Sequence, residues 1–87
     1  MIIEKFNNRD PKPIYQRFLE KGRMLPDGLL YKESWIEANF ERCFQLMECD
    51  DVSLLQKWIL EWQDLAELGV IAVAEPQKTS ELVKKFL

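Results

Sequence analysis

The order of strand-like and helix-like segments constrains this chain more than any other feature of its sequence. Residues 1–6 form a short β-like run, and two further runs, 29–36 and 42–49, flank a loop centred on Asn39. The run 70–74 is continuously apolar and rich in β-branched residues, which predicts a strand buried on both faces. Four strands are therefore expected.

Helix signals separate these strands. Apolar residues recur at helical spacing over 11–21 and again over 52–66. Asp10, which precedes a proline, and the pair Asp50 and Asp51 are good helix starts, because a carboxylate accepts hydrogen bonds from the free N–H groups of the first turn. Gly22 is expected to end the first helix in the left-handed conformation.

The resulting order is β-α-β-β-α-β, followed by a short C-terminal helix that Thr79 is expected to cap. This is the order of the ferredoxin-like, split βαβ arrangement. Right-handed crossovers would place both main helices on one face of a four-stranded antiparallel sheet. No linker, repeat or low-complexity segment interrupts the chain, so residues 1–87 are predicted to form one α+β domain.

The second face of the sheet is predicted to carry large apolar groups as well. With the loop centred on Asn39, the predicted pairs, all on one face, are Trp35 with Cys43, Glu33 with Gln45 and Tyr31 with Met47. A chain of 87 residues has little material to cover two apolar faces, so a second copy in a two-fold dimer is the simplest cover. Two stacked sheets would form a dimeric α+β barrel. The alternative is that the apolar residues of the second face are scattered on the surface of a monomer.

The composition removes several classes of site. The chain has no histidine, which excludes zinc or haem sites that use a histidine ligand and catalysis by a histidine base. Its net charge of -3 argues against nucleic acid as a partner, and no apolar run approaches the roughly 20 residues of a membrane span. We expect no cofactor and no metal, since Asp50 and Asp51 are better explained as a helix start than as a metal pair.

The two cysteines bear on the compartment. Cys43 and Cys49 are predicted to lie on one strand, where six residues span roughly 20 Å, which is too far for a disulfide. We therefore expect reduced, packed thiols and a cytoplasmic location.

Several runs of the sequence carry a family resemblance, and the most specific is Arg42-Cys43-Phe44-Gln45-Leu46-Met47-Glu48. The others are Ile3–Phe6, Asp10–Phe18, Gly22–Leu29, Ser34-Trp35, Trp58 and Trp62–Leu65. Over residues 1 to about 75 the chain resembles a small family of bacterial proteins known as domain of unknown function family 3303. The resemblance implies the dimeric α+β-barrel class and no particular activity.

Polar and aromatic residues near the sheet are the candidates for a ligand site. They are Glu4, Arg17, Arg23, Tyr31, Glu33, Trp35, Gln45 and Met47. Glu4 or Glu33 is a candidate general base or ligand anchor, and Gln45 a group to orient a carbonyl. The fork of Arg17 or Arg23 suits a carboxylate or phosphate. The simpler alternative is that Glu33 and the arginines are solvated or ion-paired surface groups.

Three functions remain open. The first is a homodimer that binds a small organic molecule between sheet and helices, with or without chemistry. The second is a non-catalytic structural or interaction dimer whose aromatic residues, Trp58 and Trp62 included, are all core. The third is a cofactor-independent enzyme resembling a monooxygenase. A pocket of a few hundred cubic ångströms, lined by Gln45, Trp35 and a carboxylate, would favour the first.

Overall fold

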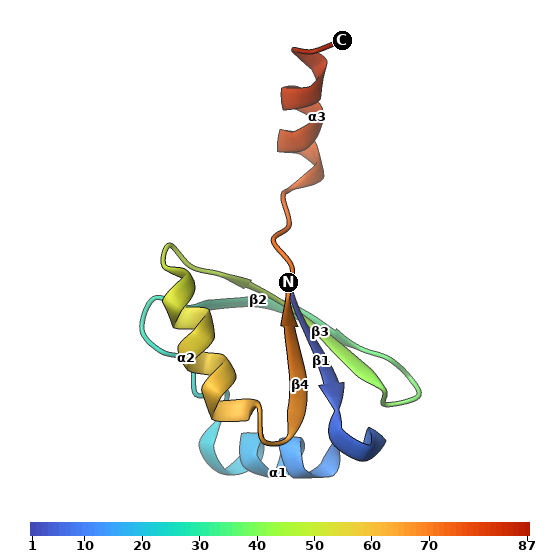
Figure 1. The fold of residues 1–87 in the computed structure, drawn as a ribbon, viewed down its shortest axis with the longest axis vertical. Coiled ribbons are helices and arrows are strands. Elements are labelled where there is room, and N and C mark those ends of the chain that lie inside the picture. The colour runs from blue at the N-terminus through green and yellow to red at the C-terminus, as the bar shows by residue number, and fades with distance from the viewer.

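The fold follows the predicted order of elements. We describe it from a computed structural model that covers all residues, 1–87. Its elements are β1 (Ile2–Phe6), a 3-10 turn (Asn7–Arg9), α1 (Lys12–Lys21), β2 (Leu30–Ile36), β3 (Arg42–Glu48), α2 (Val52–Trp62), β4 (Ala66–Val70) and α3 (Pro76–Lys84). The β-α-β-β-α-β order with an additional C-terminal helix is confirmed (Figure 1).

The four strands form one antiparallel sheet in the order β2-β3-β1-β4. This order is consistent with the ferredoxin-like arrangement, in which the first strand lies inside the sheet. Ile2 and Phe6 of β1, Ile14 of α1, and Trp58 and Trp62 of α2 belong to one buried cluster. The core therefore lies between one face of the sheet and the two main helices.

Local hydrogen bonds mark the helix ends at or close to the predicted positions. At the start of α1, Asp10 Oδ1 accepts from the backbone N–H of Lys12 at 3.1 Å. At the start of α2, Asp51 Oδ1 accepts from the backbone N–H of Ser53 at 2.9 Å. Gly22 follows α1 with φ 68°, a conformation that costs glycine little because it has no Cβ. The predictions for Gly22 and for the start of the second helix are confirmed, whereas α1 begins at Lys12, one residue later than predicted, with Pro11 and not Asp10 in the N-cap position.

The hairpin register near the loop was predicted wrongly by one residue. The observed pairs are Ile36 with Cys43, Trp35 with Phe44, Ser34 with Gln45 and Glu33 with Leu46. The centre of the loop falls after Asn39 because Phe40 takes a left-handed conformation with φ 60°. Aromatic residues rarely adopt that conformation, so the sequence does not signal it.

A β-bulge then restores the predicted register at the far end of the hairpin. One extra residue on β2, between Tyr31 and Glu33, brings Tyr31 opposite Met47. Glu33 and Trp35 consequently lie on the sheet face away from the helices, because neighbouring side chains on a strand alternate between faces. This corrects the prediction that they share a face with Gln45 and Met47.

The fourth strand lies four residues earlier than predicted. The run 70–74 was expected to be the strand, but β4 is Ala66–Val70 and α2 already ends at Trp62. Ala66 is buried and pairs with Phe6 of β1, whereas the residues after Val70 are exposed. Pairing with β1 sets the position of β4. The pairs extend from Phe6 with Ala66 to Ile2 with Val70, so most of the apolar run 70–74 lies outside the sheet.

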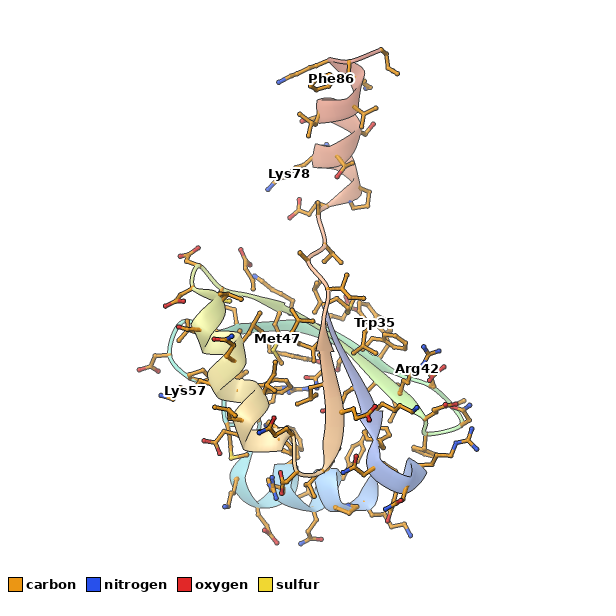
Figure 2. The ribbon with its side chains drawn as sticks, in the orientation of Figure 1. Trp35, Arg42, Met47, Lys57, Lys78 and Phe86 are labelled. Carbon is orange, nitrogen blue, oxygen red and sulfur yellow. The ribbon has the colours of Figure 1, made fainter.

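The helix α3 stands apart from the body of the molecule, as Lys78 and Phe86 show in Figure 2. It begins at Pro76, not at a Thr79 cap as predicted. An extended segment, residues 71–75, separates it from β4. Its apolar side chains are largely exposed, as are those that follow it: Leu82, Val83, Phe86 and Leu87. Nothing in the chain covers them.

Candidate functional site

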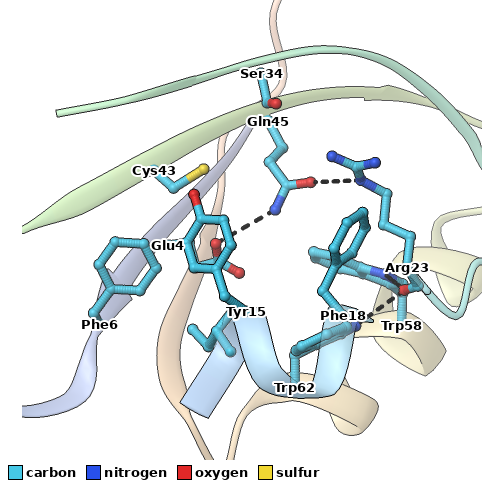
Figure 3. Close-up of a pocket in the computed structure, with 11 residues that line it drawn as sticks. Glu4, Phe6, Tyr15, Phe18, Arg23, Ser34, Cys43, Gln45, Trp58 and Trp62 are labelled. Carbon is cyan, nitrogen blue, oxygen red and sulfur yellow. Dashed lines mark hydrogen bonds between the residues drawn. The ribbon is translucent and has the colours of Figure 1, made fainter. Parts of the chain in front are cut away.

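A cavity of about 100 Å³ lies between the sheet and the two main helices (Figure 3). It is smaller than the few hundred cubic ångströms expected from the sequence, and Trp35 is not part of its wall. The residues that line it are Glu4, Phe6, Ile14, Tyr15, Phe18, Arg23, Ser34, Cys43, Gln45, Trp58 and Trp62. Its wall therefore combines an aromatic and aliphatic surface with a small set of polar groups.

Three polar side chains form a row along one side of the cavity. The Nε–H of Arg23 donates to Gln45 Oε1 at 3.3 Å, and Gln45 Nε2 donates to Glu4 Oε1 at 3.4 Å (Figure 3). Glu4 and Gln45 are 3% and 6% exposed, so both are buried polar groups in a hydrophobic core. Strand alternation places them there, because Glu4 lies between the core residues Ile2 and Phe6 on β1.

Burial shifts the ionisation of the groups beside this row. The pKa of Glu4 is raised by desolvation, against the opposing effects of hydrogen bonds from Gln45 and Cys43 and of the Arg23 charge. Burial, together with the nearby Glu4, raises the pKa of the Cys43 thiol to about 12. Cys43 is therefore a protonated thiol and a poor nucleophile at neutral pH. The pKa of Tyr15 is also raised, chiefly by burial.

The guanidinium of Arg23 lies against aromatic rings. Its Cζ is 3.5 Å from the centroid of Tyr31 and 5.3 Å from that of Phe18. The backbone carbonyl of the same residue accepts from Trp58 Nε1 at 2.9 Å and from Trp62 Nε1 at 3.1 Å. Two side chains of α2 thus hold the backbone of Arg23, and this positions the start of the Arg23 side chain.

The structure brings together part of the predicted site. Glu4, Arg23 and Gln45 meet at the cavity. Tyr31 lies beside Arg23, and its hydroxyl is 2.6 Å from that of Ser34. Met47 packs against the core without lining the cavity.

Three predicted residues lie elsewhere. Arg17 makes two hydrogen bonds to the carboxylate of Asp64, at 2.8 and 2.7 Å, and one to the carbonyl of Glu61 at 2.9 Å. It is an inter-helix tether outside the cavity. Glu33 and Trp35 lie on the open face of the sheet because of the one-residue register difference.

Five residues of the cavity wall were not predicted from the sequence: Phe6, Ile14, Tyr15, Phe18 and Ser34. Tyr15 and Phe18 belong to the same helical stripe as the buried Ile14, so their periodicity contained the signal. Ser34 was missed because its facing depends on the hairpin register. Trp58 and Trp62 are core residues, as expected, and their rings also form part of the wall.

The arrangement offers hydrogen-bonding and charge rather than a metal site. No group of three or more Cys, Asp or Glu side chains is placed to hold a metal ion. Asp51, considered above as one half of a metal pair, is the cap of α2.

None of the helices has both the length and the apolar character that crossing a membrane requires.

The chain has an α+β fold, and its strand order is consistent with the ferredoxin-like arrangement. The chain belongs to the family called Domain of unknown function (DUF3303), whose model matches residues 1–87, α3 included. No curated protein and no solved structure matched the chain in the two other comparisons.

Proposed function

We propose that this protein binds a small organic molecule in the cavity between the sheet and the helices. The observation that carries the proposal is the row of Glu4, Gln45 and Arg23 beside unfilled space. Buried polar groups are costly unless they are well paired, and the bonds within this row are long, at 3.3 and 3.4 Å. A ligand in the cavity would supply better partners. The cavity is well below the ~300–1,000 Å³ of sites for drug-sized molecules, so the buried part of the ligand is small.

We further propose that the working form is a homodimer joined through the open face of the sheet. Ile3, Phe44 and Trp35 lie side by side on that face, in three adjacent strands, and Trp35 is 48% exposed. A cluster of apolar side chains on an uncovered face favours an interface. A second copy presents the same surface, and a two-fold axis makes the contact self-complementary. A non-catalytic interaction dimer is the second candidate, since the open face alone supports it.

We place this dimer in the cytoplasm. Cys43 and Cys49 are both free thiols, partly buried against the core. Secreted domains this small commonly use their cysteines in disulfides, so unpaired cysteines favour a reducing compartment.

The ligand proposal is tested by a thermal-shift screen of small acids, amides, phenols and alcohols against the full chain. Binding raises the melting temperature by mass action. Cys43→Leu fills the cavity and should abolish the shifts, whereas Cys49→Leu, which adds the same volume outside the cavity wall, should retain them. Each variant is compared with its own unliganded melting temperature. If no compound shifts the wild-type protein, the cavity is a packing defect and the interaction dimer is the better description.

A further inference from the structure

Arg23 differs from the other arginines in its lack of a carboxylate partner. Arg9 pairs with Glu41, Arg17 with Asp64 and Arg42 with Glu37, at 3.1, 2.7 and 2.8 Å. Arg23 forms no salt bridge, and its side chain makes one hydrogen bond, from Nε to Gln45. Its two terminal nitrogens have no acceptor in the chain.

The Glu4 carboxyl does not contact Arg23 directly. The amide of Gln45 lies between them, with its oxygen toward Arg23 and its nitrogen toward Glu4 (Figure 3). Burial favours the uncharged form of the Glu4 carboxyl. Arg23 is therefore a partly buried cation that no carboxylate contacts, an arrangement that is costly unless a partner binds it.

We propose that the cavity binds a small organic carboxylate, whose two oxygens accept from the terminal nitrogens of Arg23. The proposal rests on the ligand-binding function proposed above and names the class of ligand. A planar guanidinium and a carboxylate match in a bidentate geometry, which a neutral amide or a cation does not reproduce. The rings of Phe18, Trp58 and Trp62 would contact the apolar part of the acid.

The size of the cavity limits the acid to a short chain. A cavity of roughly 150 Å³ is known to hold benzene, and this one is about 100 Å³. Short aliphatic acids such as propionate and butyrate therefore fit the buried part better than aromatic acids do.

The charge balance makes the binding depend on pH. The groups that face Glu4 are Gln45 and Cys43 from β3, Tyr15 from α1, and Arg23 from the segment after α1. Of these, Arg23 alone carries a charge at neutral pH. Ionised Glu4 would compete with the ligand for that cation, so affinity should fall as the pH rises through the raised pKa of Glu4.

The experiment titrates the full chain with butyrate, butyramide and butylamine, following the indole N–H resonances of Trp58 and Trp62 by NMR. Butyrate should give saturable shifts, and the other two compounds should not. Arg23→Gln should weaken butyrate binding by about tenfold or more, since a charge-assisted bidentate pair is lost. Arg9→Gln makes the same change at a surface pair and should leave the affinity unchanged. Above the pH range in which butyrate itself takes up a proton, Glu4→Gln should remove the pH dependence.

The outcomes separate this proposal from the one on which it rests. Equal binding of butyrate and butyramide, or full retention of butyrate affinity in Arg23→Gln, would overturn the carboxylate class while leaving a ligand site. Absence of binding by all three compounds, together with a blank thermal-shift screen, would overturn both. If Arg23→Gln fails to fold, Arg23→Lys keeps the charge without the fork and should still weaken binding.

Discussion

Glu4 departs furthest from the ordinary surroundings of its residue type. It occupies a core position on β1, 3% exposed, between Ile2 and Phe6. Desolvation raises its pKa because the charged form loses its hydration there. A buried glutamate of this kind makes the domain less stable above its pKa, and such a cost is typical of functional positions.

The first prediction concerns the pH dependence of stability. As the pH rises above the ordinary value of 4.5, Glu4 ionises in the unfolded chain but keeps its proton in the folded one. The free energy of unfolding should therefore fall until the pH passes the raised pKa, by about 1.4 kcal/mol for each unit that separates the two pKa values. Urea unfolding from acid to neutral pH measures this, and Glu4→Gln should flatten the profile.

Glu33→Gln is the matched control, because Glu33 is exposed on the open face. It should leave the slope of the wild-type profile unchanged. A profile for Glu4→Gln that still falls as steeply as that of the wild type would mean that another group causes the loss.

Residue types in the sequence predicted part of the site. Which of the other candidates belong to it depends on the side chains that they contact in the fold. A glutamate and a glutamine on strands beside aromatic residues pointed to Glu33 and Gln45, with Glu4 as the alternative carboxylate. In the structure Glu4 and Gln45 meet at the cavity, and Glu33 lies elsewhere. Arg17 and Arg23 had equal claims from the sequence. Only the fold shows that Asp64, 47 residues away, pairs with Arg17, whereas no acid pairs with Arg23.

Among the elements, the segment between α1 and β2 depends most on contacts from elsewhere in the chain. The indoles of Trp58 and Trp62 both donate to the carbonyl of Arg23. Further along, Leu29 is buried in the core, and Gly28 precedes it with φ 93°. This segment is therefore held at both ends, and its position determines where the Arg23 guanidinium lies.

The second prediction compares two glycines in different elements. Gly28→Ala would place a Cβ 3.1 Å from Leu54 Cδ1 at a positive φ, so we expect a loss of about 1–3 kcal/mol in the free energy of unfolding. Gly69→Ala would meet only the carbonyl oxygen of Ile3, at 3.9 Å, within β4. There we expect a gain of roughly 0.5 kcal/mol, since alanine loses less backbone entropy in a strand.

Urea unfolding of both variants measures the comparison. An unchanged free energy of unfolding in Gly28→Ala would show that the strain at Gly28 is relieved by movement of the loop. A loss confined to Gly69→Ala would contradict the observed position of β4.

The molecule as a whole carries two apolar surfaces that the chain itself does not cover. One is the open face of the sheet, with Trp35 at its edge, and the other is the apolar side of α3. Isolated helices of nine residues are marginal in water, so α3 requires a contact to remain helical. The proposed homodimer would cover the open face of the sheet, and we expect the same partner to contact α3.

The third prediction tests that dimer. We test two substitutions, Trp35→Glu on the open face and Phe86→Glu just after α3. Each should lower the molar mass measured by light scattering toward that of a monomer. A charge buried in an apolar interface is costly, so dissociation should increase by about tenfold or more. Leu60→Glu is the control, because Leu60 is 67% exposed on α2 and lies on the helix side of the sheet. A monomeric wild-type protein at all concentrations would rule out the dimer.

The sequence by itself determined the order of the elements, the end of α1 and the start of α2. These features depend on local chemistry: apolar spacing, carboxylate caps and a glycine with positive φ. The tertiary structure decided the hairpin register and the position of β4, because both depend on pairing with a strand that is distant in sequence. It also decided which arginine is free, since an ion pair needs a partner that only the fold brings near.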